Sequence, residues 1–138
     1  MLRIELMTWD KARALAAPIR FTVFVQEQRV PAEIELDDMD ARCVHALAFD
    51  GDAAVGTGRL LPDGHIGRMA VLKEFRNRGV GAAMLKRLIE AARERGDREV
   101  ALSAQVHAVR FYRAHGFVEE GPEYEDAGIQ HQSMRLSL

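Results

Sequence analysis

Two glycines, Gly79 and Gly81, stand where a charged turn gives way to an amphipathic helix. The first backbone amides of a helix have no internal partner, and the helix dipole places partial positive charge there, so the position favours an anion. Glycine lets a phosphate approach the backbone without meeting a side chain. Arg76 and Arg78 flank the glycines and can add charge-assisted hydrogen bonds. The spacing predicts a phosphate-binding turn of the kind that holds a pyrophosphate.

This turn does not match the best-known phosphate motifs. The stretch after Gly81 lacks the third glycine of a dinucleotide fingerprint, and no acidic residue ends a following strand in the expected way. No GxxxxGK[ST] sequence occurs, which excludes a P-loop. A helix start whose glycines serve only close packing would show the same short pattern. The glycine pair alone therefore leaves both interpretations open.

The elements around the turn predict a mixed α/β domain. Apolar runs indicate strands at 2–7, 43–49, 53–61, 65–71, 99–103, 117–119 and 130–138, and helical spacing indicates helices at 80–96 and 106–115. The buried stripe expected for the first of these helices is Met84, Leu85, Leu88, Ile89 and Ala92. Pro18 should divide the N-terminal helical stretch into two short helices. Since the strand at 99–103 follows a crossover helix, it should lie parallel to the strand that ends at Val71.

Composition excludes several classes of protein. A chain of 138 residues is predicted to form one domain, residues 1–138, whose core needs no disulfide. The net charge of -2 gives no general basic surface for nucleic acid, and no apolar run approaches the roughly 20 residues of a membrane span. A single cysteine, Cys43, fits a reducing compartment, and no signal peptide is visible. We expect a cytoplasmic protein with neither a nucleic-acid nor a membrane partner.

Two longer motifs are more specific than the glycine pair. Residues 76–81 fit the pattern [Q/R]-x-x-G-x-[G/A], and residues 108–117 fit A-x-x-x-Y-x-x-x-G-F. In this order and at this separation they resemble the motifs of the GCN5-related N-acetyltransferase (GNAT) superfamily. RFTVFVQEQRVP near the start and GIQHQSM near the end resemble its ElaA/YjcF-like group of small acetyltransferases. The resemblance covers nearly the whole chain. It implies a GNAT fold, a mixed and mostly antiparallel sheet with a central parallel pair splayed for coenzyme A and flanked by helices.

The resemblance also implies an acetyl-CoA site along that parallel pair. The pantetheine arm would pair with the main chain of residues 69–71, and the glycine turn would hold the pyrophosphate through backbone amides. Gln105 stands where many members carry an asparagine that contacts the pantetheine arm. The residues implied to bind acetyl-CoA are Met69, Ala70, Val71, Arg76, Asn77, Arg78, Gly79, Val80, Gly81, Ala82, Gln105, Phe111 and Tyr112.

Acetyl transfer to an amine needs an acid for the leaving thiolate and a base for the ammonium. Tyr112 stands where the family often places that acid, and a phenol with an ordinary pKa near 10 suits a thiolate partner. The same tyrosine also fits the apolar stripe of its helix as a core aromatic. For the base, the resemblance points to His131, because glyphosate N-acetyltransferases carry a catalytic histidine in a similar G-x-x-H-x-x-M setting. Glu35 and Glu33 are the rival bases.

The segment 26–42 that holds these glutamates is rich in acidic residues. It is either a solvated loop or a rim that attracts a cationic amine to the mouth of a site. In the family this region lies beside the acceptor pocket, so Glu33 is a candidate for substrate binding. Arg68, next to the pantetheine strand, could bind a carboxylate of the acceptor or pair with the acidic segment.

None of the five histidines forms an HxxxH pair and no CxxC occurs, so we expect no metal. Cys43 lacks the pattern of a nucleophile. With these exclusions, the resemblance to the GNAT superfamily implies an N-acetyltransferase that moves acetyl from acetyl-CoA to the amine of a small molecule by direct attack in a ternary complex. The alternatives are a CoA-binding sensor with little catalysis, or an acetyltransferase of protein N-termini or lysines. A homodimer is possible.

Overall fold

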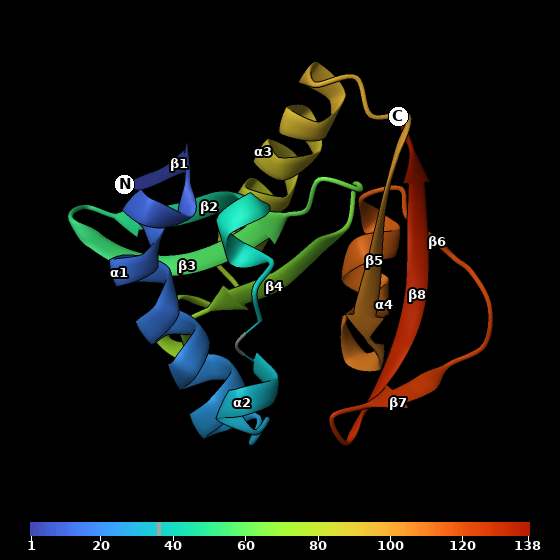
Figure 1. Cartoon of the computed structure of the whole chain (residues 1–138), viewed down its shortest axis with the longest axis horizontal. Coiled ribbons are helices and arrows are strands. Elements are labelled where there is room, and N and C mark those ends of the chain that lie inside the picture. The colour runs from blue at the N-terminus through green and yellow to red at the C-terminus, as the bar shows by residue number, and fades with distance from the viewer. Residues whose placement is uncertain (36) are drawn as a thin grey trace.

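The computed structural model describes residues 1–35 and 37–138, and its strands lie in two antiparallel sheets (Figure 1). The first sheet has the order β1-β2-β3-β4, and the second has the order β5-β8-β6 with β7 paired to β8. The strands of the first sheet are β1 (Leu2–Met7), β2 (Val44–Asp50), β3 (Ala53–Leu60) and β4 (Ile66–Val71). Those of the second are β5 (Glu99–Gln105), β6 (Val118–Glu119), β7 (Tyr124–Asp126) and β8 (Ile129–Ser137).

Helices cover both faces of the first sheet. The helical elements are α1 (Trp9–Arg20), the π-helical η1 (Phe21–Glu27), α2 (Ala32–Glu35), α3 (Val80–Glu94) and α4 (Val109–Ala114), with 3-10 turns η2 (Asp40–Arg42), η3 (Lys73–Phe75) and η4 (Val106–Ala108). Along β2, Ala46 and Ala48 belong to the core that contains α3, whereas Leu47 and Phe49 belong to the core that contains α1. β2 is therefore buried on both faces, which accounts for its continuous apolar run. No helix in the described ranges is long and apolar enough to span a membrane.

The stripe predicted for α3 is confirmed. All five of its residues, Met84, Leu85, Leu88, Ile89 and Ala92, are buried. They pack against the first sheet and against Val100 and Leu102 of β5. One helix thus anchors both sheets and fixes the position of the turn that precedes it.

Among the described residues, the two sheets are bridged next to the start of β4. A parallel bridge joins His65 to Ala101, and the Ala101 amide donates to the carbonyl of Gly64 at 3.1 Å. Beyond this bridge, β4 and β5 share no further ladder within the described residues. The predicted parallel pair and its splaying are confirmed, and so is the fold class.

β4 carries a bulge beside this opening. The β3–β4 register pairs Thr57 with Ala70 but Arg59 with Gly67, so β4 has one residue more than β3 between those pairs. Arg68 lies in the bulge with a φ of 52°, a left-handed conformation that is uncommon for residues other than glycine. The bulge therefore re-aims the side chains of β4 at the opening between the sheets.

The N-terminal helix is not divided at Pro18, and the prediction of two short helices was wrong. α1 continues to Arg20 and passes directly into η1. Proline removes its own N–H donor, but its fixed φ is compatible with a helix. The Phe21 amide already reaches the carbonyls of Ala17 and Pro18. The loss is confined to about one turn, and the helix widens into η1 instead of ending.

Boundaries also differ in the last third of the chain. β5 extends past its predicted end to Gln105, and the predicted helix at 106–115 begins as η4 and continues as α4. β7 was not predicted. It pairs with β8 across a two-residue turn, Ala127 and Gly128, where both φ values are positive.

Candidate active site

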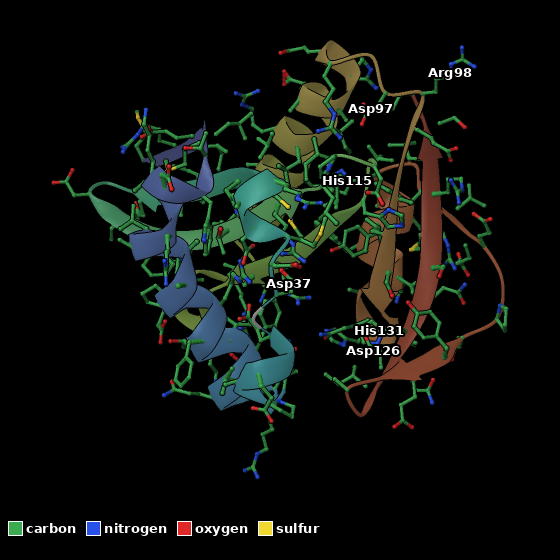
Figure 2. The ribbon with its side chains drawn as sticks, viewed as in Figure 1. Asp37, Asp97, Arg98, His115, Asp126 and His131 are labelled. Carbon is green, nitrogen blue, oxygen red and sulfur yellow. The ribbon has the colours of Figure 1, made fainter. Side chains whose placement is uncertain are left out.

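A cleft of about 1370 Å³ lies between β4 and β5. Sites for drug-sized ligands usually measure about 300–1,000 Å³, so this one has room for a long cofactor and a second substrate. Its walls come from η1 and α2, from β4 and the turn before α3, from β5 and α4, and from the β7–β8 hairpin. Figure 2 shows Asp126 and His131 together at the hairpin, with Asp37 on the opposite side.

The structure brings most of the sequence-predicted residues to this cleft. Those that line it are Glu35, Arg68, Met69, Ala70, Val71, Arg76, Asn77, Gly79, Val80, Gly81, Ala82, Gln105, Phe111, Tyr112 and His131. Two predicted residues, Glu33 and Arg78, do not line the cleft. Glu33 is exposed on α2, and the guanidinium of Arg78 lies 5.5 Å from the ring centre of Phe75.

The glycine turn forms one end of the cleft. Asn77 and Gly79 have φ values of 63° and 80°, and Gly79 is the N-cap of α3 with no side-chain cap. The first amides of α3 therefore lack a capping side chain at the cleft wall, as an anion site requires. A Cβ on Gly81 would lie 3.6 Å from the ring of Phe111, so glycine keeps the space between the turn and α4 open.

Arg76 is committed to protein partners instead of pointing a free guanidinium at this turn. Its Nη1 and Nη2 donate to the two carboxylate oxygens of Glu27 at 2.6 and 2.7 Å, and its Nε donates to the carbonyl of Val71 at 2.9 Å. The hydrogen bond from Arg76 lowers the pKa of Glu27 below its ordinary value. Arg76 thus ties η1 to the end of β4, and the turn offers mainly backbone amides to an anion.

β4 supplies a free edge along the cleft. Met69, Ala70 and Val71 all line it. β4 pairs with β3 on one side, and beyond the His65 bridge no described strand pairs with its other side. An extended ligand can therefore pair with the main chain of β4, as an added strand would.

Tyr112 lies on α4 with its ring packed against Phe111 and Phe117 at centroid distances of 5.0 and 5.9 Å. Burial raises the pKa of Tyr112 to about 12. The phenol is therefore protonated throughout the physiological range. In this position it packs against the aromatic residues around α4, and its protonated hydroxyl is able to donate a hydrogen bond at the cleft wall.

Gln105 and His131 are partners across β5 and β8, so their side chains lie on the same face. Nδ1 of His131 lies 2.7 Å from the carbonyl oxygen of Ile129. A carbonyl only accepts, so Nδ1 carries a proton, and in the neutral ring Nε2 holds the lone pair. The ring stacks on Tyr124 with centroids 5.9 Å apart. His131 is thus held in an orientation that leaves Nε2 able to accept a proton.

The acidic segment is neither uniformly solvated nor an open acidic rim. Glu35 and Asp40 are buried, and both pair with Arg20, the Nε of which lies 2.5 Å from Oε1 of Glu35. Asp40 also accepts from Arg59 at 2.9 Å. Although burial raises it, the pKa of Asp40 is held below its ordinary value by these arginines. The segment is therefore fastened to the core by ion pairs.

Two further residues, Asp37 and Arg68, complete this cluster. Arg59 donates to both oxygens of Asp37 at 2.9 and 2.8 Å, and this lowers the pKa of Asp37 to about 2. Arg68 donates through Nη2 to the carbonyl of Glu35 at 3.0 Å and reaches Asp37 only at 3.4 Å. The cluster thus contains three arginines and three carboxylates.

Gln28 and Asp126 are among the polar residues of the cleft that sequence reasoning missed. Gln28, at the end of η1, accepts a hydrogen bond of 2.8 Å from Nε2 of Gln105 and so links the two sides of the cleft. Asp126 lines the cleft beside His131 (Figure 2). The signal for Asp126 was the sequence Asp-Ala-Gly, a turn sequence that indicates a hairpin and hence a strand before it.

Cys43 is buried outside the cleft lining, and burial raises the pKa of its thiol. Its Sγ donates to the carbonyl of Met39 at 3.2 Å. A buried thiol with a raised pKa is poorly placed to act as a nucleophile. Within residues 1–35 and 37–138, no group of three histidine, cysteine or acidic side chains is arranged to hold a metal ion.

Comparison with known proteins identifies the class to which this fold and cleft belong. Residues 13–138 match the family described as Acetyltransferase (GNAT) domain, so the chain belongs to the GNAT acetyltransferases. N-acetyltransferase YjcF of Bacillus subtilis, itself uncharacterized, is 42% identical over 120 residues, which are 84% of this chain and 86% of that protein. Protein ElaA of Escherichia coli is 32% identical over 124 residues, 84% of this chain and 81% of that protein.

Solved structures agree with this assignment. The crystal structure of Escherichia coli ElaA matches with a TM-score of 0.88 and 27% identity, covering 99% of this chain and 100% of that one. An acyl-CoA N-acyltransferase from Pseudomonas aeruginosa matches with a TM-score of 0.88 and 29% identity over the same shares. The resemblance to the ElaA/YjcF-like group is therefore confirmed.

Proposed function

We propose that the protein transfers acetyl from acetyl-CoA to the amine of a small molecule by direct attack while both are bound. The observation that carries this proposal is the single cleft that joins the glycine turn of α3 to Tyr112 and His131. With its pyrophosphate at the turn and its pantetheine arm along β4, the donor has its thioester near these side chains. The acceptor then enters beside α2 and the β7–β8 hairpin. Holding both reactants together removes much of the entropic cost of their encounter.

His131 is the proposed base for the attacking amine. Its Nδ1 proton is committed to Ile129, which leaves Nε2 to take a proton from the ammonium or from an intervening water. Glu35 is the less suitable base, because a proton on its carboxylate would weaken the ion pair with buried Arg20. Tyr112 is the proposed donor to the thiolate that leaves.

The order of the reaction is tested by initial rates measured while acetyl-CoA and an amine are varied together. Direct transfer predicts intersecting double-reciprocal lines, and an acyl-enzyme predicts parallel lines. Cys43→Ala is the matched control and should keep full activity, because its thiol is buried away from the cleft. Donor binding without turnover of any amine would overturn the enzymatic role in favour of a sensor. Turnover of peptides but of no small amine would favour a protein acceptor.

The base is tested by pH–rate profiles of kcat/KM for wild type, His131→Ala and Glu35→Gln. His131→Ala should lose the acidic limb of the profile and lower kcat/KM by about 10²-fold, the low end for general base catalysis. Glu35→Gln should keep that limb. If instead Glu35→Gln loses the acidic limb and His131→Ala keeps it, the base is Glu35. Melting temperatures of both variants, measured first, establish that each is folded.

A further inference from the structure

The ion cluster contains three arginines, Arg20, Arg59 and Arg68. Of these three, only Arg68 has a strained backbone conformation. Its φ of 52° places it in the left-handed region, which is unfavourable for a residue with a side chain because the Cβ crowds the following carbonyl oxygen. Such strain persists where the surroundings hold it, and it is common in ligand-binding sites. The bulge of β4 turns this side chain to the cleft wall, where it is half-buried.

The carboxylates of the cluster are already used by the other two arginines. Glu35 and Asp40 accept hydrogen bonds of 2.5 and 2.8 Å from Arg20. Asp37 takes a two-pronged contact from Arg59. Arg68 reaches these groups only at longer range, with 3.4 Å to Asp37 and 3.7 Å to Glu35. Its close contact, at 3.0 Å, is with the neutral carbonyl of Glu35.

Accordingly, the described residues do not provide an acceptor for every N–H donor of Arg68. Its Nε is buried and has no hydrogen-bond partner in the described parts of the chain. Burial lowers the pKa of Arg68, and the neighbouring charge of Arg59 lowers it further. The pKa values of Arg20 and Arg59 are raised instead, despite their burial, by hydrogen bonds to carboxylates. Of the three arginines, Arg68 carries the positive charge that nearby carboxylates balance least.

We propose that the acceptor amine also carries a carboxylate, and that Arg68 binds this carboxylate while the amine faces His131. This inference rests on the proposed function and names its substrate class, an amino acid in the broad sense of one molecule with both groups. A carboxylate is planar and matches the donor fork of a guanidinium, which adds both energy and orientation. It would also supply the negative charge that the cluster does not give to Arg68.

The β7–β8 hairpin, on the other side of the acceptor end from Arg68, carries a negative charge. Asp126 lies beside His131 on the β7–β8 hairpin, and Asp37, which Arg68 contacts, lies across from them (Figure 2). An ammonium group is attracted to Asp126, and a carboxylate is attracted to Arg68. A molecule with both groups would therefore be oriented with its nitrogen towards His131.

The first test compares acceptors that differ only in the carboxylate. Glycine, β-alanine, γ-aminobutyrate and phenylalanine are each assayed with acetyl-CoA, and each is compared with its own amide. The set varies the distance between the amine and the carboxylate and the size of the side chain. We expect at least one free acid to have a KM about 10- to 100-fold below that of its amide, the range of a hydrogen-bonded charge pair. Arg68→Gln should remove this difference, Arg68→Lys should restore part of it, and Arg13→Gln, on the exposed face of α1, should not change it.

The second test does not need turnover. Calorimetric titration of CoA-bound protein with the N-acetylated acids and with their amides should show tighter binding of at least one acid, lost in Arg68→Gln. Equal affinity of acids and amides for wild type, or equal turnover of both, overturns the inference and leaves the proposed function standing. Preferential binding of acids with no acetylation of any amine supports the carboxylate site and overturns the proposed function.

The carboxylate at Arg68 has a second chemical source, a dicarboxylic acyl group on the donor. Succinyl-CoA with a simple amine such as phenethylamine is therefore the third arm. If Arg68→Gln impairs only the reaction of succinyl-CoA, the carboxylate belongs to the donor, and the assignment to the acceptor is overturned. If Arg68→Gln loses activity only with amines that carry a carboxylate, the assignment to the acceptor is supported.

Discussion

Replacing Tyr112 by phenylalanine removes one oxygen from the cleft and leaves the packing of α4 in place. The ring is held by edge contacts to Phe111 and Phe117, and both contacts survive the change. The variant should therefore fold with a melting temperature close to that of wild type. Any large change in rate then reports on the hydroxyl alone.

The expected size of that change follows from the pKa of Tyr112, which burial raises to about 12. An ordinary thiol has a pKa near 8.5, so complete proton transfer from this phenol to a thiolate would be uphill by about 5 kcal/mol. Tyr112 is accordingly better suited to donate a hydrogen bond as the thiolate develops. Hydrogen bonds to charged groups contribute about 1.5–3 kcal/mol, so kcat of Tyr112→Phe should fall by about 10- to 150-fold.

The assay is release of free CoA, followed with a thiol reagent at saturating amine, together with calorimetric binding of acetyl-CoA. We expect kcat to fall while the Kd of acetyl-CoA changes little, because the contact forms only as the thioester breaks. Tyr124→Phe is the matched control. It removes the same atom from a residue that stacks on His131 but does not line the cleft. An unchanged kcat, or an alkaline limb near pH 10 that disappears in Tyr112→Phe, would refute this reasoning.

Three other substitutions give direct outcomes. Ala127→Asn should raise the free energy of unfolding in urea by about 1 kcal/mol, because Ala127 has a φ of 53° before Gly128 and Asn-Gly is the preferred pair for such a turn; a decrease contradicts the turn assignment. Asp37→Asn tests acid stability. Arg59 lowers the folded-state pKa of Asp37 to about 2, so this stabilisation is present above the ordinary value near 3.8 and is lost as pH falls through 2. The stability advantage of wild type over Asp37→Asn should shrink between pH 5 and pH 2 by about 1 kcal/mol, a figure discounted for the partial exposure of the carboxylate, and a constant difference argues against the pair. Gly81→Glu should abolish the rise in Tm that acetyl-CoA causes, whereas Gly81→Ala, whose Cβ fits at 3.6 Å from Phe111, should keep it; a retained shift in Gly81→Glu places the donor elsewhere.

The elements that could be predicted from the sequence are those in which the local pattern and the tertiary contacts agree. α3 has its apolar stripe on one side and glycine at its start, and each feature alone indicates the same helix with the same buried face. The strands of the first sheet were likewise predicted to within a residue or two. In these segments, burial adds to a preference that the chain already has, so little information from distant residues is required.

Partner choice between distant charges could not be predicted in the same way. The motif placed Arg76 beside a phosphate, yet it bonds to Glu27, 49 positions earlier in the chain. The acidic segment showed its charge in the sequence, but burial of Glu35 depends on Arg20 emerging from α1 at the same place. A charge pattern gives the types of group available, and the packing of helices against the sheet decides which of them meet.

The bulge in β4 shows how a feature that is silent in the sequence determines the site. The extra residue at Arg68 shifts Met69 over β3, where its sulfur lies so close to Gly58 that even a Cβ there would collide with it. Glycine at 58 therefore has a packing cause that no local pattern in β3 could reveal. A methyl group at this position would displace Met69 and, through it, the bulge that directs Arg68 to the cleft. Gly58→Ala should thus weaken the discrimination between free acids and amides although Gly58 itself does not line the cleft, and discrimination that survives in a folded Gly58→Ala protein would separate the role of Arg68 from the bulge.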